Sequence, residues 1–83
     1  MGMQESIAEY IIKELAIGRT KPIQPDEDLF SSGILDSLGV LQLVLFIEEQ
    51  LGIQVPDEDV VFDNFKDIAT LTAYLRSRSA SNA

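Results

Sequence analysis

The stretch Gly33-Ile34-Leu35-Asp36-Ser37-Leu38 joins a polar loop to the most apolar predicted helix of the chain, residues 37–51. Aspartate is a favoured residue before a helix, because its carboxylate accepts a hydrogen bond from an unpaired N–H of the first turn. Ser37 therefore falls at the start of that helix. The residues leave two roles open for Ser37: part of an ordinary helix start, or a site of covalent attachment. Capping alone favours the first.

The predicted helix over residues 37–51 carries two apolar stripes. At about 100° per residue, one stripe covers about a third of the circumference and is expected to face the core. It consists of Val40, Leu43, Val44, Ile47 and Leu51. The second stripe, Leu38, Leu41 and Leu45, lies about 140° away and is bordered by Glu48 and Glu49. It either packs under the loop or a neighbouring helix, or forms an exposed strip on which a partner docks.

Helical periodicity recurs on both sides of this segment. A first helix is predicted over residues 4–17, ending before Gly18. A last helix is predicted over residues 67–78, where Asp67 at the start and Arg76 and Arg78 at the end match the helix dipole. The apolar faces of these helices are formed by Ile7, Ala8, Ile11 and Leu15, and by Ile68, Leu71 and Leu75.

The connections differ in length. Residues 18–36 form a long loop in which Pro22 and Pro25 oppose regular pairing, while two apolar pairs, Leu29-Phe30 and Ile34-Leu35, are expected to hold it on the core. Residues 57–62 suit one or two helical turns. The predicted fold is all-α, with three main helices, one short helix and a long loop between helices 1 and 2.

The length and amino-acid composition of the chain limit the classes of function that it can have. The 83 residues predict a single domain, 1–83, with an ordered core over about 4–78 and a flexible tail over 79–83. A net charge of −8 disfavours nucleic-acid binding, and no apolar run is long enough for a membrane span. The acidic pair Asp26 and Asp28 is interpreted as a solvated turn, and no metal site is predicted. A cytoplasmic monomer is expected.

Self-catalysis at Ser37 is not expected. The chain contains neither His nor Cys, and a serine hydroxyl is a poor nucleophile without an activating base. The start of a helix does tolerate negative charge, because its first N–H groups are unpaired and its dipole is positive there. A phosphodiester on the Ser37 oxygen would suit this position. Asp36 could help to hold a magnesium ion while another enzyme attaches the group.

The segment Gly33-Ile34-Leu35-Asp36-Ser37-Leu38-Gly39-Val40-Leu41-Gln42-Leu43 resembles the attachment signature of the acyl and peptidyl carrier protein family, with Asp-Ser-Leu at its centre. The resemblance covers about residues 5–78. It also includes Ile47-Glu48-Glu49, the acidic turn Asp57-Glu58-Asp59, and the last helix from Phe65 to Leu75.

The resemblance implies a four-helix bundle that carries 4′-phosphopantetheine on Ser37, installed from coenzyme A by a phosphopantetheinyl transferase with the help of Asp36. The thiol of this group would hold an acyl or aminoacyl cargo as a thioester, so that a chain without Cys takes part in thiol chemistry. The chain itself would not be an enzyme. Its further partners would be an adenylating ligase or an acyltransferase that loads the cargo, and condensing or tailoring enzymes that use it.

The chain departs from the fatty-acid carriers at two positions that are commonly acidic in them, here Gly39 and Gln42. The start Leu35-Asp36-Ser37-Leu38-Gly39, with a largely apolar second helix, resembles stand-alone carriers that receive amino acids or unusual acyl groups from a dedicated adenylating ligase. A carrier for fatty-acid or polyketide synthesis and a cofactor-free helical interaction module are the alternatives. The residues expected to contact partners are Leu38, Gly39, Leu41, Gln42, Leu45, Glu48 and Glu49.

Overall fold

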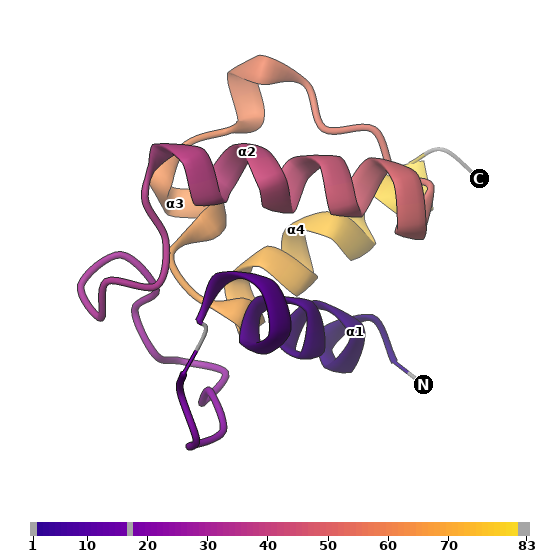
Figure 1. Cartoon of the computed structure of the whole chain (residues 1–83). Helices are drawn as coiled ribbons and strands as arrows, with labels where there is room; N and C mark the ends of the chain where they lie inside the picture. The colour runs from indigo at the N-terminus through magenta and orange to yellow at the C-terminus, as the bar shows by residue number, and fades with distance from the viewer. Residues whose placement is uncertain (1, 17, 82–83) are drawn as a thin grey trace.

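The computed structural model describes residues 2–16 and 18–81, which form helices and loops without β-strands (Figure 1). Helix α1 (Met3–Tyr10) continues into a π-helical turn, η1 (Ile11–Leu15), and α2 (Ser37–Phe46) continues into η2 (Ile47–Leu51). The third long helix is α4 (Ile68–Ser81). Two short pieces, the 3₁₀ turn η3 (Asp57–Asp59) and the single-turn helix α3 (Phe62–Phe65), separate α2 from α4. The predicted fold class, three main helices and a short one, is confirmed.

Several helix boundaries differ from the prediction. The first helix, together with η1, spans Met3–Leu15 instead of 4–17, of which residue 17 lies outside the described residues, and the last helix begins at Ile68 instead of 67. The short helix was expected over residues 57–62, but Val61 is extended (φ −129°, ψ 159°) and divides this region into η3 and α3. A β-branched residue favours such a conformation, and buried Phe65 anchors the second piece. Helix α4 ends at Ser81, three residues beyond the predicted end at residue 78. Residues 82 and 83, part of the predicted tail, lie outside the described residues.

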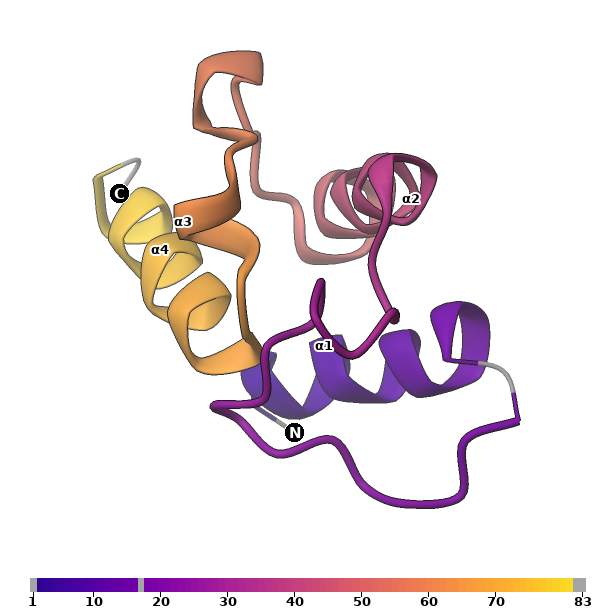
Figure 2. The same cartoon turned by 90° about the vertical axis from the view of Figure 1, so that its left-hand side faces the viewer.

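The core lies where α1, α2 and α4 meet. Figure 2, which views α2 nearly end-on, shows α1 below it, α4 to one side, and the segment containing η3 and α3 between α2 and α4. All the core-stripe residues of α2 and η2 contact this core, with Leu43 and Ile47 fully buried. The buried core is formed by Ile7, Ile11, Ile23, Leu29, Leu35, Leu43, Ile47, Ile53, Val55, Phe65, Ile68, Leu71 and Leu75.

The long loop is held on the core, as its apolar pairs predicted. Leu29 is fully buried, its N–H donates to the carbonyl of Lys66 (2.8 Å), and its own carbonyl accepts from the N–H of Leu35 (2.9 Å). At the loop's outer end, Arg19 makes two hydrogen bonds to the carboxylate of Glu27, 2.7 and 2.8 Å long. These contacts fix the path of the loop and therefore the position of the start of α2.

Helix α2 begins and ends with well-formed caps. Asp36 precedes its first residue, as predicted. Beyond η2, Gly52 adopts the left-handed conformation (φ 69°), which glycine reaches without the steric cost that a Cβ would add. The apolar segment between these residues is thus fixed at both ends, with Ser37 at its first position.

Candidate functional site

Asp36 determines the local geometry around Ser37. Its backbone is extended (φ −129°, ψ −172°), and its carboxylate oxygen Oδ1 accepts a 2.8 Å hydrogen bond from the N–H of Gly39. Its carbonyl accepts from the N–H of Val40 at 2.9 Å, which closes the first helical turn. Ser37 follows Asp36 directly and precedes Gly39 and Val40. The two hydrogen bonds of Asp36 to these residues therefore fix the backbone of Ser37.

Ser37 is solvent-exposed at the first position of the ten-residue helix α2. The N–H groups at the start of a helix and the helix dipole give this end a partial positive charge. A phosphodiester on the Ser37 oxygen would therefore be electrostatically favoured there. The sequence has no His or Cys that could activate the Ser37 hydroxyl as a base.

An apolar hollow of about 570 Å³ opens beside Ser37. The rings of Phe30 and Phe62 lie at one part of its wall, with centroids 5.2 Å apart. Phe62 and Val61 remain about half exposed, at 51% and 47%. The hollow is lined by Phe30, Asp36, Ser37, Val40, Leu41, Val60, Val61, Phe62 and Phe65. An extended, partly apolar group attached to Ser37 would fit along this surface, so the residues present suit phosphopantetheine.

The wall of this hollow formed by residues 60–62 was missed by the sequence analysis. The available signal was the run Val60-Val61-Phe62, three apolar residues directly after an acidic turn. The run is fixed at its start by Asp59, whose carboxylate accepts a 2.5 Å hydrogen bond from the hydroxyl of Tyr74. Burial, followed by the hydrogen bond to Asp59, raises the pKa of Tyr74 to about 12.

Three further contacts hold η3 and the run after it in place. Arg78 lies 3.7 Å from the Asp59 carboxylate and donates to the carbonyl of Gln54 at 2.9 Å. Asn64 donates to the carbonyl of Asp59 at 2.9 Å. Arg78 was expected to match the helix dipole, and its side chain also links α4 to Gln54 before η3 and to Asp59 at the end of η3. The link fixes the outer wall of the hollow relative to α4.

Gly39 faces the interior of the molecule. It is buried, and a Cβ on it would lie 3.3 Å from both Leu35 Cδ2 and Asp36 Oδ1. The atoms closest to this position belong to the end of the chain's own loop and to the helix cap. A buried glycine offers no side chain to a partner, so Gly39 is removed from the surface that we propose for docking below.

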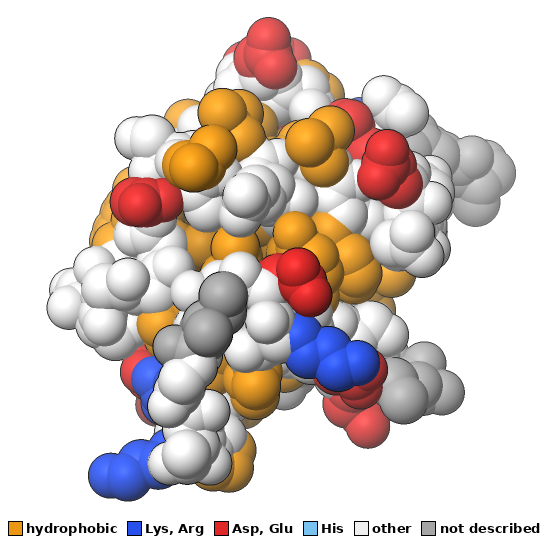
Figure 3. Space-filling model, viewed as in Figure 1, with side chains coloured by type: hydrophobic (Ala, Val, Ile, Leu, Met, Phe, Trp, Pro, Cys, Tyr) orange, Lys and Arg blue, Asp and Glu red, His pale blue; other side chains and the backbone are white. Residues whose placement is uncertain are grey.

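The second stripe of α2 is exposed. Leu38, Leu41 and Leu45 expose 63%, 59% and 56% of their surface. Figure 3 shows apolar side chains gathered over α2. We call these three residues the leucine strip. Burial of the strip, one of the two alternatives left open by the periodicity, is therefore wrong, because neither the loop nor another described helix covers it, and partner docking stays a prediction.

The polar neighbours of the leucine strip differ in their accessibility. Gln42 and Glu49 are exposed. Glu48 is half-buried, and its carboxylate accepts a 3.2 Å hydrogen bond from the N–H of Val55. This bond holds the connector after η2 in place. Glu48 therefore has a structural contact in addition to the partner contact expected of it.

The acidic turn in the long loop has its own internal partners. Asp28 Oδ1 accepts hydrogen bonds from the N–H groups of Phe30 and Ser31, each 2.9 Å long. The bond from Ser31 is the largest cause that lowers the pKa of Asp28. Within residues 2–16 and 18–81, no group of three or more acidic side chains is placed to hold a metal ion. Over the same residues, no helix is long and apolar enough to cross a membrane.

Comparison with known proteins places this geometry in a family context. The family described as "Phosphopantetheine attachment site" matches residues 5–75. A solved structure described as "Crystal structure of FAD-dependent dehydrogenase" contains a similar chain, with a TM-score of 0.76 and 29% identity. The match covers 83% of this chain and 97% of that one.

Curated relatives carry two kinds of name. The chain is 40% identical over 52 residues to D-alanyl carrier protein 2 of Lactiplantibacillus plantarum, covering 63% of this chain and 65% of the relative, just under two thirds of its length. It is 41% identical over 59 residues to the D-alanyl carrier protein of Enterococcus faecalis, covering 71% and 74%. It is 30% identical over 71 residues to the acyl carrier protein of Acidothermus cellulolyticus, covering 86% and 82%.

Proposed function

Because the chain belongs to the family of phosphopantetheine-binding carrier proteins, we propose that Ser37 is its attachment residue and that its cargo is an amino acid or an uncommon acyl group. Family membership makes the protein a non-catalytic carrier with a 4′-phosphopantetheine group, which removes the alternative of a cofactor-free interaction module. When bound, this group supplies a terminal thiol that holds cargo as a thioester.

The exposed position of Ser37 is the observation that carries the proposal. Ser37 is the first residue of α2, the helix that Asp36 caps, and it borders the apolar hollow. Each feature has a separate role. Exposure admits a phosphopantetheinyl transferase, the helix start stabilises the phosphodiester charge, and Asp36 fixes the serine backbone and assists magnesium during attachment.

The hollow beside Ser37 is proposed to hold the attached arm against the bundle between reactions. Its aromatic wall, Phe30 and Phe62, provides apolar surface, and burying such surface contributes about 25 cal/mol per Å². Because Phe62 remains half exposed, the hollow is open on that side. The arm can therefore leave for a partner enzyme without unfolding of the core.

The leucine strip is proposed to contact the transferase and the loading enzyme. Gln42 and Glu49 are the polar contacts we propose beside it, with Glu48 as a secondary one. Three exposed leucines next to the attachment residue form an apolar docking area, and the acidic side chains suit basic residues on the partner.

Two observations support an amino-acid or specialised cargo. Two relatives, at 40% and 41% identity, are named D-alanyl carrier proteins. The two positions that are commonly acidic in fatty-acid carriers carry no charge here, because Gly39 is buried and Gln42 is exposed but neutral. We propose an adenylating ligase as the loading enzyme. The protein would act as a cytoplasmic monomer.

A carrier in fatty-acid or polyketide synthesis is the second candidate. It is supported by the acyl carrier protein of Acidothermus cellulolyticus, whose match covers more of the chain than the D-alanyl carriers do. Charging assays with purified holo protein distinguish the two candidates. Our proposal predicts charging by an ATP-dependent amino-acid or acyl ligase. Charging by a malonyl transferase alone would favour the second candidate.

The solved structure described as an FAD-dependent dehydrogenase supports one proposal about a downstream partner. A flavoprotein dehydrogenase would oxidise the tethered cargo, and the two hydrogens removed would pass to FAD. Mixing charged holo protein with such an enzyme and following flavin bleaching without oxygen tests this step. Equal bleaching with free cargo would show that tethering is not required.

A further inference from the structure

A second groove lies between α1 and α2, on residues that take no part in the hollow beside Ser37. Two adjoining hollows, of about 490 and 340 Å³, share Tyr10, Glu14, Phe46 and Gln50. None of these residues lines the hollow beside Ser37. We call the combined feature the α1/α2 groove. Figure 3 shows apolar surface between these two helices, with acidic and basic side chains at its border.

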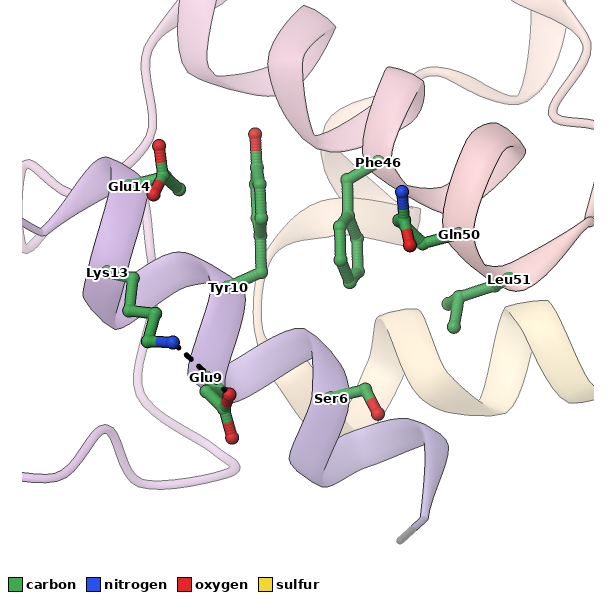
Figure 4. A pocket seen from close by; sticks show the side chains of 8 residues that line it. All are labelled: Ser6, Glu9, Tyr10, Lys13, Glu14, Phe46, Gln50 and Leu51. Carbon is green, nitrogen blue, oxygen red and sulfur yellow. Dashed lines mark ion pairs between the residues drawn. The ribbon is translucent and has the colours of Figure 1, made fainter.

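The floor of the groove is aromatic and already ordered. The rings of Tyr10 and Phe46 are stacked, with centroids 4.2 Å apart and an angle of 20° between their planes. In Figure 4, Tyr10 extends from α1 towards α2 and Phe46 extends from α2 towards α1. The Tyr10 hydroxyl donates to the carbonyl of Gln42 at 3.3 Å. A ligand at this floor would contact an apolar surface that is already fixed, so binding would cost little side-chain entropy in the protein.

The border of the groove is mainly acidic. Its lining includes the carboxylates of Glu9, Glu14 and Glu49, and Lys13 is the basic residue among them. Lys13 lies 3.7 Å from Glu9, and both side chains are mostly exposed, so this pair is weak. The net charge around the aromatic floor is thus negative. This charge repels anionic ligands and attracts arginine and lysine.

The groove is continuous with the leucine strip but lies away from Ser37. Leu45, the last residue of the strip, also lines the groove. Phe46 is nine positions after Ser37, and at 1.5 Å per residue the two backbones are separated by about 13 Å along α2. A partner in the groove can therefore contact α1 and the end of α2 while the start of α2 remains accessible.

We propose that the α1/α2 groove is a second docking surface, which binds a protein segment with one aromatic or long aliphatic side chain flanked by at least two arginine or lysine residues. The apolar side chain would contact the Tyr10 and Phe46 floor, and the basic residues would pair with Glu14 and Glu49. Docking at this groove would be a function in addition to cargo attachment. A carrier held at this groove by one protein presents Ser37 to other enzymes at a raised local concentration.

The test uses a defined probe and the whole chain. The ¹⁵N-labelled protein is titrated with a helical 15-residue peptide that carries one central Trp flanked by Arg one turn away on each side. A second peptide carries Glu in place of each Arg. We expect amide shift changes centred on Tyr10, Phe46 and Gln50 with the basic peptide only. Dissociation constants are then measured for the variants Glu14→Lys and Glu49→Lys.

The matched control is Glu58→Lys, which makes the same charge change on η3, outside the groove. We expect the groove variants to weaken peptide binding at least tenfold and the control to weaken it less than twofold. Equal weakening by all three variants would overturn the proposal, because it would show a general charge effect. Shift changes centred on Val61 and Phe62, or peptide-free dimerisation through Tyr10 and Phe46, would also overturn it.

A last measurement separates this surface from the attachment site. Phosphopantetheine transfer to Ser37 is followed by intact mass at saturating basic peptide. We expect the KM of the transferase for the carrier to rise, because the peptide covers Leu45 and Glu49, and the maximal rate to remain within twofold of that without peptide. Loss of transfer would overturn the claim that Ser37 stays accessible when the groove is filled. Failure of transfer in the absence of peptide would instead count against Ser37 as the attachment residue, so the two proposals fail in different ways.

Discussion

Asp36 Oδ1 lies 2.8 Å from the backbone nitrogen of Gly39 and 3.3 Å from the position that a Gly39 Cβ would occupy. The same carboxylate thus caps α2 and limits the size of the residue three positions later. Leu35 limits it from the other side, with Cδ2 also 3.3 Å away. Ser37 lies between these residues, so its position depends on a small, tightly packed turn.

Removing the cap should affect both folding and attachment. We expect Asp36→Ala to lower the free energy of unfolding by about 1 kcal/mol, because it removes the hydrogen bond to the Gly39 N–H. Asp36→Asn keeps a capping oxygen and should be nearly as stable as the parent chain. Urea unfolding checks both values, and the rate of phosphopantetheine transfer is measured on the same variants. If Asp36→Asn were loaded as fast as the parent chain, the proposed role of the carboxylate charge in attachment would be wrong.

A larger residue at position 39 should disturb this turn. We expect Gly39→Val to lower the free energy of unfolding by about 1–3 kcal/mol, because the added methyl groups crowd Leu35 and the Asp36 carboxylate. The control is Gln42→Val on the exposed face of the same helix, which should change stability by about 0.5 kcal/mol. Equal effects of the two variants in thermal unfolding would mean that Gly39 is not tightly packed.

The leucine strip should matter for partners more than for folding. Leu41 is 59% exposed, so Leu41→Asp should lower the free energy of unfolding by less than about 1 kcal/mol. It should raise the KM of the transferase for the carrier at least fivefold, because it places a charge in an apolar contact. Leu43→Ala is the buried comparison on the same helix and should cost about 2–5 kcal/mol. An unchanged KM for Leu41→Asp would contradict docking at the strip.

The periodicity of apolar residues was sufficient to predict the three long helices, because each helix buries an apolar face at helical spacing. Ile68, Leu71 and Leu75 are all buried as predicted. The exposed state of the leucine strip could not be decided in advance, because it depends on where the loop over residues 18–36 runs. The inward position of Gly39 depends on the same loop. The break at Val61 and the bonds of Asp59 to Tyr74 and Arg78 arise from contacts distant in sequence, which local patterns do not encode.

The contact between Tyr74 and Asp59 predicts a loss of stability at high pH. A tyrosine in the unfolded chain has a pKa of about 10, whereas that of Tyr74 in the folded protein is raised to about 12. Between these values the unfolded chain has released the proton and the folded chain retains it. The contribution is therefore complete below about pH 10 and is lost as the pH rises towards about 12.

Urea unfolding at several pH values checks this sign. We expect the free energy of unfolding to fall from pH 10 to pH 12 and the fall to be smaller in Tyr74→Phe. The pKa of Tyr10 is also raised, first by burial and then by the nearby Glu14 carboxylate. Tyr10→Phe is therefore measured alongside Tyr74→Phe, so that the contributions of the two hydroxyls are told apart. An identical pH dependence in the parent chain and in Tyr74→Phe would show that the Tyr74 hydroxyl does not contribute.

The central claim is that Ser37 carries the phosphopantetheine group. The most direct test incubates the purified chain with coenzyme A, magnesium and a broad-specificity phosphopantetheinyl transferase, and reads the intact mass. The parent chain should gain the mass of one phosphopantetheine, and Ser37→Ala should gain none while keeping its helical circular dichroism. A mass gain that persists in Ser37→Ala, or no gain in the folded parent chain, would contradict the assignment.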